Sequence, residues 1–180
     1  MIYEEYKQLS AYARYDGFYL SILWVASFAC TLGASLLPIL GHFSTLLLFS
    51  SPFFVAYRLR LFRDEGRNGI ISYGRGLFYC LRVFFNASVL FSFLQWLYMN
   101  YLDNGRIYRM MTTLFSSQEG RQALTDFGLS YDQFQSTLPD ILQPTFFASV
   151  SFIYSIIIGV FCSLIIAAVM ASKIGQKRTK

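Results

Sequence analysis

The chain has 180 residues, of which 55% are hydrophobic, 19% aromatic and only 14% charged. Soluble domains carry about 25% charged residues, so this composition excludes an ordinary water-soluble domain and indicates an integral membrane protein. The formal net charge of +5 comes from a few charged blocks between long uncharged runs, a pattern that orients a protein in a membrane and does not indicate a nucleic-acid partner.

The first 16 residues are polar and rich in tyrosine, and they lead into an apolar run. Tyr12, Tyr15 and Tyr19 are spaced to share one side of a helix. Tyrosine is typical of the headgroup level of a bilayer, because its ring is apolar and its hydroxyl is polar. The acidic residues of the segment and the length of the apolar run argue against a cleavable signal peptide, so we expect the segment to be retained.

Residues 17–57 contain no charged side chain. A membrane helix needs about 20 residues, so this run is too long for one crossing, and the sequence PILGH at 38–42 supplies a break. We predict two membrane helices, at about 17–37 and 43–62, with His42 at the tip of the turn. The second helix includes Arg58, whose guanidinium group we expect to reach the headgroups.

An arginine-rich segment separates the second and third apolar runs and sets the predicted topology. Cytoplasmic segments of membrane proteins carry an excess of Lys and Arg, so we place this segment and both termini in the cytoplasm. The basic tail after residue 172 agrees with this orientation. Six arginines stand against two acids, Asp64 and Glu65, and they are Arg58, Arg60, Arg63, Arg67, Arg75 and Arg82.

The use of arginine alone in this segment indicates a possible second role. A planar guanidinium group binds phosphate or carboxylate through two parallel hydrogen bonds. The arginines are therefore candidate ligands for an anionic lipid, a polyprenyl phosphate or an acidic surface of a partner protein. The alternative is a solvated segment that only sets the topology.

The third membrane helix is expected at about 74–101 and contains an arginine well inside an apolar run. Arg82 lies about 13 Å along the axis from Tyr73, at 1.5 Å per residue. Arg75, Arg82 and Asn86 fall on one stripe of this helix. Ionisable residues inside a membrane are functional candidates, so the stripe is interpreted as an extension of the anion site or a subunit contact. Alternatively, Arg82 reaches back to the cytoplasmic headgroups.

The segment 102–143 is the one sizeable polar portion of the sequence. We expect two or three amphipathic helices here, forming a small cap over the outer ends of the bundle. Ser117 is a candidate start of one short helix and Gly128 a candidate end. Ser130 and Gln133 match the S-x-x-Q capping box of another.

The last membrane helix is expected at about 145–172 and carries a small residue at every fourth position. Small side chains let helix backbones approach closely in lipid. We interpret the stripe as a packing face within the chain, with a homodimer face as the alternative, and Ala26, Cys30 and Ala34 as a shorter complementary stripe. The longer stripe comprises Ser151, Ser155, Gly159, Ser163, Ala167 and Ala171.

The predicted fold is an all-α membrane protein that forms a single domain over residues 1–180. It has four transmembrane helices, cytoplasmic N- and C-termini, and a helical extracytoplasmic cap between the third and fourth helices. The sequence contains no Walker loop, HExxH or GxSxG motif and no cluster of metal-ligand residues. We therefore expect no catalytic residue, no metal and no cofactor.

Three stretches resemble the bacterial family known as domain of unknown function 4199, typical of Bacteroidetes: NGIISYGRGLFYC at 68–80, LSYDQF at 129–134 and ASKIGQKRTK at 171–180. The resemblance covers nearly the whole chain and is most specific at 70–82. It implies a multi-pass protein of the inner membrane of Gram-negative bacteria, without an established activity. It also nominates a partner, a family 2 glycosyltransferase that acts on a polyprenyl phosphate.

Two functional hypotheses result. The preferred one is a non-catalytic membrane subunit that anchors or scaffolds a partner enzyme at the cytoplasmic face, where the six arginines and Asn86 bind the lipid phosphate or the partner's acids. The alternative is a small oligomeric translocator of lipid or solute, in which Arg75, Arg82 and Asn86 line a path between protomers.

Overall fold

The computed structural model describes residues 3–66 and 69–171, and this part of the chain is all-α. Four of its helices are long and apolar enough to cross a membrane, which suggests a multi-pass membrane protein. Arg67, one of the predicted site residues, lies outside the described residues. The helices of the described residues are α1 (Tyr3–Gly33), α2 (Ile39–Gly66), α3 (Tyr73–Tyr101), α4 (Arg106–Ser116), α5 (Gln118–Asp126), α6 (Tyr131–Ile141) and α7 (Pro144–Met170).

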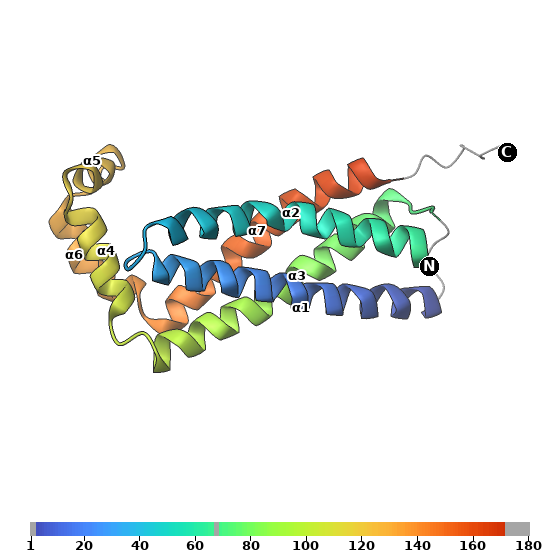
Figure 1. Ribbon diagram of the computed structural model, residues 1–180, viewed down its shortest axis with the longest axis horizontal. Helices are drawn as coiled ribbons and strands as arrows, with labels where there is room; N and C mark the ends of the chain where they lie inside the picture. The colour runs from blue at the N-terminus through green and yellow to red at the C-terminus, as the bar shows by residue number, and fades with distance from the viewer. Residues whose placement is uncertain (1–2, 67–68, 172–180) are drawn as a thin grey trace. The chain divides into compact units, whose positions relative to one another are not determined.

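The chain divides into two compact units. The first unit comprises α1, α2, the part of α3 up to Phe91 and the part of α7 from Phe152. The second unit comprises residues 92–151, with α4, α5 and α6. In the first unit, the start of α1, the end of α2 and the start of α3 lie at the same end (Figure 1).

Four long apolar helices are present, as predicted, and the first pair differs from the prediction in two respects. Helix α1 begins at Tyr3, so the polar N-terminal segment is the first part of the same helix. The turn between α1 and α2 covers residues 34–38, and His42 lies in α2 rather than at the tip of the turn. Pro38 immediately precedes α2, where its missing N–H group would have no helical acceptor in any case.

Helices α1 and α2 form an antiparallel hairpin (Figure 1). Polar side chains of the two helices form hydrogen bonds with each other between them. Near the turn, the Ser44 hydroxyl lies 2.7 Å from the Thr31 hydroxyl and 3.0 Å from the Ser27 hydroxyl. Further from the turn, Trp24 Nε1 donates a hydrogen bond to Ser51 Oγ at 2.9 Å. Hydroxyl and indole groups can join membrane helices in this way because neither carries a charge.

The core of the first unit is aromatic and lies where α3 meets the other helices. The rings of Phe62 on α2 and Tyr79 on α3 are stacked, with centroids 5.2 Å apart. Trp24 on α1 contacts both Phe84 and Phe91 on α3. Aromatic contacts of this kind bury large apolar areas and fix the relative rotation of neighbouring helices.

The small-residue stripe of α7 packs against α3 within the first unit. A Cβ atom built on Gly159 would lie 2.7 Å from the Cβ atom of Phe84, and Ala167 lies next to Gly76. Ser163 is fully buried between these two positions, and its hydroxyl donates to the carbonyl oxygen of Gly159. The neighbour of the stripe at these positions is therefore α3.

The remaining members of the two predicted stripes have other surroundings. Ser155 lines a groove, Ala171 directly follows the last residue of α7, and Ser151 belongs to the second unit. On α1, Ala26 is exposed, so the shorter stripe is not the surface that receives Gly159.

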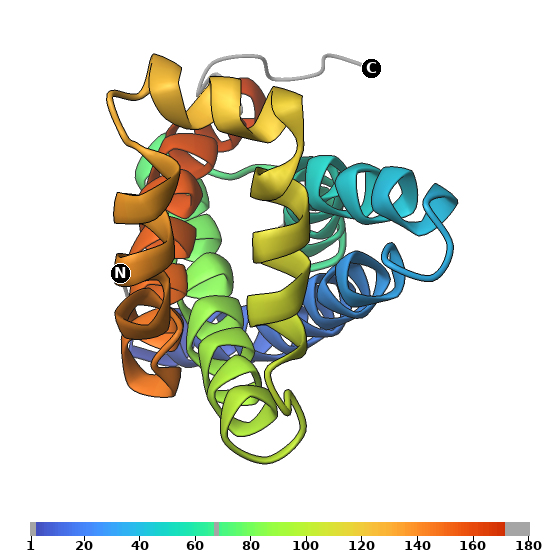
Figure 2. The same ribbon diagram turned by 90° about the vertical axis from the view of Figure 1, so that its left-hand side faces the viewer.

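The second unit contains three short helices, as predicted, and Figure 2 shows α5 running from the end of α4 across to the start of α6. The Ser117 side chain accepts a hydrogen bond at the start of α5, and Ser130 and Gln133 form the complete capping box of α6. Gly128 adopts a positive φ of 74° just after α5, a conformation that glycine adopts without steric cost. Phe115 and Phe134 join α4 to α6, with ring centroids 4.7 Å apart.

Candidate functional site

A buried carboxylate on α1 is the centre of the polar network in the first unit. Asp16 is 1% exposed and lies within the candidate membrane span Tyr6–Gly33. Arg58 Nε on α2 donates to Asp16 Oδ1 at 2.5 Å. The Tyr79 hydroxyl on α3 donates to the other carboxylate oxygen, Oδ2. One acidic side chain therefore connects three of the four long helices.

The surroundings of this cluster explain why it is stable in an apolar core. A buried carboxylate is costly unless it is paired and hydrogen-bonded, and here each oxygen of Asp16 receives a donor. Arg58 supplies the opposite charge, and its side chain is 29% exposed. Its guanidinium group also lies 6.0 Å from the centre of the Tyr19 ring, which favours the cation. The pair is neutral overall, so the bundle encloses no net charge at this point.

This cluster differs from what the sequence predicted. Arg58 was expected to reach the headgroups, but it turns toward α1 and pairs with Asp16. Asp16 was interpreted only as part of a polar N-terminal segment. The signal that identifies the pair is the hairpin register, because both residues lie a similar number of residues from the turn at 34–38. An antiparallel pairing then places them at the same level.

The chemistry of the cluster is that of a structural ion pair. Both carboxylate oxygens of Asp16 are occupied by protein donors, and the Tyr79 ring is packed against Phe62. In residues 3–66 and 69–171, no group of three His, Cys, Asp or Glu side chains lies close enough to hold a metal ion. We therefore assign Asp16, Arg58 and Tyr79 to the joining of α1, α2 and α3.

Arg60 and Arg63, near the end of α2, share one acid, and the Arg63 side chain is 23% exposed. Arg63 Nε lies 2.9 Å from Asp64 Oδ1, and Arg60 Nε lies 3.6 Å from Asp64 Oδ2. The Arg60 side chain is 65% exposed. Exposed ion pairs contribute little to stability, so the exposed Arg60 can exchange Asp64 for another anion.

The three residues of the predicted stripe on α3 have different surroundings. The Arg82 guanidinium carbon lies 5.8 Å from the centre of the Tyr6 ring and 5.7 Å from that of Phe78. Asn86 Nδ2 donates to the carbonyl oxygen of Ala13 at 3.5 Å. Both side chains therefore face α1. Arg75 lies half-buried in the first turn of α3.

The approach of α1 to Asn86 depends on a glycine. A Cβ atom built on Gly17 would lie 2.7 Å from the Cβ atom of Asn86 and 2.9 Å from the carbonyl oxygen of Val83. Any larger residue at this position would separate the helices and displace the neighbouring Asp16. The described members of the predicted site thus form four groups: Arg58 in the core, Arg60 with Arg63 at the end of α2, Arg75 at the start of α3, and Arg82 with Asn86 against α1.

Comparison with known proteins supports the sequence resemblance. The family model described as protein of unknown function (DUF4199) matches residues 15–172. The match includes Asp16, Arg58, Tyr79 and Arg82. No curated protein and no solved structure matches the chain.

Proposed function

The chain belongs to the DUF4199 family of proteins of unknown function, so we propose a function from its geometry: a non-catalytic membrane subunit that anchors a partner enzyme. The proposed docking surface is the end of the first unit where α2 finishes and α3 begins. We propose that this end faces the cytoplasm, because cytoplasmic segments carry the excess of arginine and lysine. Both termini are then cytoplasmic, and residues 102–143 lie on the opposite side of a bacterial inner membrane.

The observation that supports this proposal is the unequal use of the arginines. Arg58 forms an ion pair with Asp16 inside the bundle. In the sequence, four further arginines of this segment stand against the two acids Asp64 and Glu65, and they are Arg60, Arg63, Arg67 and Arg75. Arg60 and Arg63 project from the last turns of α2 and share Asp64. A segment with more arginines than acids is suited to bind an acidic surface.

The partner that we propose is a peripheral enzyme with an acidic patch next to its membrane-facing side. The resemblance nominates a family 2 glycosyltransferase that uses a polyprenyl phosphate. In this arrangement the subunit supplies attachment and orientation, while the partner supplies the catalytic residues. The guanidinium groups of Arg60 and Arg63 would form charge-assisted hydrogen bonds with the partner's carboxylates.

The test is an affinity purification of the tagged full chain from its native host in mild detergent, with the co-purifying proteins quantified by mass spectrometry. The double variant Arg60→Glu with Arg63→Glu reverses the charge of the proposed surface. Arg109→Glu is the matched control, since Arg109 is an exposed arginine of α4.

We expect wild type and the control to retain one stoichiometric partner and the double variant to lose it. Equal recovery of that partner with all three proteins would overturn the docking role of this surface.

A further inference from the structure

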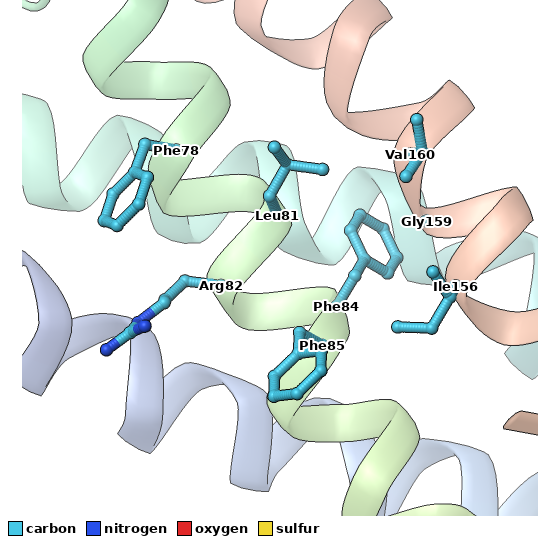
Figure 3. Close-up of a pocket in the computed structure, with 8 residues that line it drawn as sticks. All are labelled: Phe78, Leu81, Arg82, Phe84, Phe85, Ile156, Gly159 and Val160. Atoms are coloured by element: carbon cyan, nitrogen blue, oxygen red, sulfur yellow. The ribbon is translucent and has the colours of Figure 1, made fainter.

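A groove of about 350 Å³ runs between α3 and α7 in the first unit (Figure 3). Its walls are apolar along most of their length. Phe84 forms its buried floor against Gly159, whereas Phe85 and Val160 are exposed at its rims, by 51% and 39%. The residues that line it are Phe78, Leu81, Arg82, Phe84, Phe85, Ile156, Gly159 and Val160.

One cation lies at the end of this apolar groove. Figure 3 shows the Arg82 side chain leaving α3 on the side of α1, whereas Leu81 and Phe84 extend toward α7. The guanidinium group is held by the rings of Tyr6 and Phe78, whose centroids are 5.6 Å apart. Cation–π contacts use the charge of the guanidinium group but leave its N–H donors available.

These donors have no acceptor in residues 6–66 and 69–171, the part of the chain whose side chains the structure describes. No oxygen of these residues accepts a hydrogen bond from Arg82, and no carboxylate pairs with it. A guanidinium group carries five N–H donors, and donors without partners are costly in an apolar environment. Arg82 can therefore donate to an acceptor other than these residues, such as a bound anion.

The position of Arg82 along the bundle indicates what that acceptor is. Its guanidinium group reaches Tyr6, in the polar N-terminal part of α1 that precedes the uncharged run from residue 17. We place the boundary between headgroups and hydrocarbon at this level, because tyrosine is typical of it and the apolar groove continues from there along the bundle. A ligand with a phosphate at one end and a hydrocarbon chain at the other matches both parts.

The residues around a neighbouring groove favour a negatively charged ligand. On the other side of Phe85, a groove of about 660 Å³ lies between α1 and α3 and is lined by Arg14 and Asn86. No carboxylate lines either groove among the described residues. Arg14 and Arg82 thus border adjacent grooves without a nearby acid in their walls, which favours an anionic headgroup over a zwitterionic one.

We propose that Arg82 and the α3–α7 groove form a binding site for an anionic diacyl phospholipid. The phosphate accepts hydrogen bonds from the Arg82 guanidinium group, and one acyl chain lies along Leu81, Phe85 and Val160. This site goes beyond the docking surface at the end of α2, because neither Arg60 nor Arg63 belongs to it.

The test uses the full chain in nanodiscs that contain equal amounts of phosphatidylglycerol and phosphatidylcholine with identical acyl chains. Native mass spectrometry then measures which lipid stays bound as the collision energy rises. We expect retention of phosphatidylglycerol to exceed that of phosphatidylcholine by about tenfold, as for one charge-assisted contact. Equal retention of both lipids by the wild type would overturn the site.

Two variants separate the parts of the site. Arg82→Gln should reduce the preference for phosphatidylglycerol to within about twofold of equality, since the charged donor is lost. Arg60→Gln removes one charge from the same end outside the groove and should keep the preference. If both substitutions lowered the preference equally, the charge of the whole surface would be responsible, and the specific site would be wrong.

Val160→Phe tests the groove independently of charge, because a ring at this rim occupies the proposed path of the acyl chain. It should lower the retention of both lipids and leave their ratio unchanged. Unchanged retention would show that the chain lies elsewhere. Displacement of phosphatidylglycerol by a polyprenyl phosphate at a concentration about tenfold lower would overturn the assignment to a diacyl lipid.

Discussion

Asp16 on α1 and Arg58 on α2 form an ion pair across the first helical hairpin, with Arg58 Nε 2.5 Å from Asp16 Oδ1. Both residues lie within candidate membrane spans. Asp16 is nearly inaccessible, and its two carboxylate oxygens accept hydrogen bonds from Arg58 and from the hydroxyl group of Tyr79. The pair therefore couples the position of α3 to the register of the hairpin.

Removing the acid should destabilise the bundle. Asp16→Ala leaves Arg58 and Tyr79 without their common acceptor. Removal of one partner from a fully buried pair costs about 3–5 kcal/mol, and we expect about 2–3 kcal/mol here because partial exposure of Arg58 screens its charge. The measurement is the free energy of unfolding in a denaturant titration of the detergent-solubilised protein.

The matched control for this substitution is Asp64→Ala, which removes an exposed acid near the end of α2. Exposed ion pairs contribute little to stability, so the control should change the unfolding free energy little. Similar effects of the two substitutions would contradict the structural role of Asp16.

The tyrosine hydroxyl should contribute separately from the ring. Tyr79→Phe preserves the stacking on Phe62 but removes the donor to Asp16 Oδ2. Hydrogen bonds to charged groups contribute about 1.5–3 kcal/mol, and we expect a loss in this range in the same unfolding assay. Tyr57→Phe, at an exposed position of α2, should have no measurable effect, and a loss as large as that of Tyr79→Phe would count against the assignment.

The contact between α7 and α3 should be sensitive to side-chain volume. Gly159→Val places a β-branched side chain where even a Cβ atom lies 2.7 Å from Phe84. Overpacking of this kind costs about 1–3 kcal/mol, so the thermal midpoint should fall. Ala168→Val adds similar volume at an exposed position of the same helix. A midpoint that falls only for the control would show that the packing face lies elsewhere on α7.

The capping box of α6 offers a local test in the second unit. Ser130→Ala removes the side-chain acceptor of the Gln133 amide, and loss of such a cap costs about 1 kcal/mol. Hydrogen exchange should therefore accelerate at the first amides of α6. Ser136→Ala changes an exposed serine inside the same helix and should leave those amides as protected as in the wild type.

The helices and the second unit's caps could be predicted from the sequence because their signals are local. A long uncharged run, a proline before a helix or an S-x-x-Q pattern needs no knowledge of distant residues. The turn at 34–38 was misplaced because PILGH contains both a break and the start of the next helix. That error moved His42 from α2 to the tip of the turn.

The contacts of the candidate site could not be predicted in the same way. Asp16 and Arg58 are separated by 42 positions, and Asp16 and Tyr79 by 63. Their meeting depends on the register of the hairpin and on the close approach of α3 at Gly17, neither of which follows from composition. For Arg82, the sequence left open whether the side chain reaches back to the interface, and the structure places its guanidinium group beside Tyr6.

The central claim is that a partner docks where α2 ends, and site-specific photocrosslinking in living cells tests it most directly. A photoreactive amino acid replaces Glu65, exposed near the end of α2, or Gln122, exposed on α5. The account predicts a discrete crosslinked protein from position 65 and none of that mass from position 122. A crosslink to the same protein from position 122 alone would contradict it.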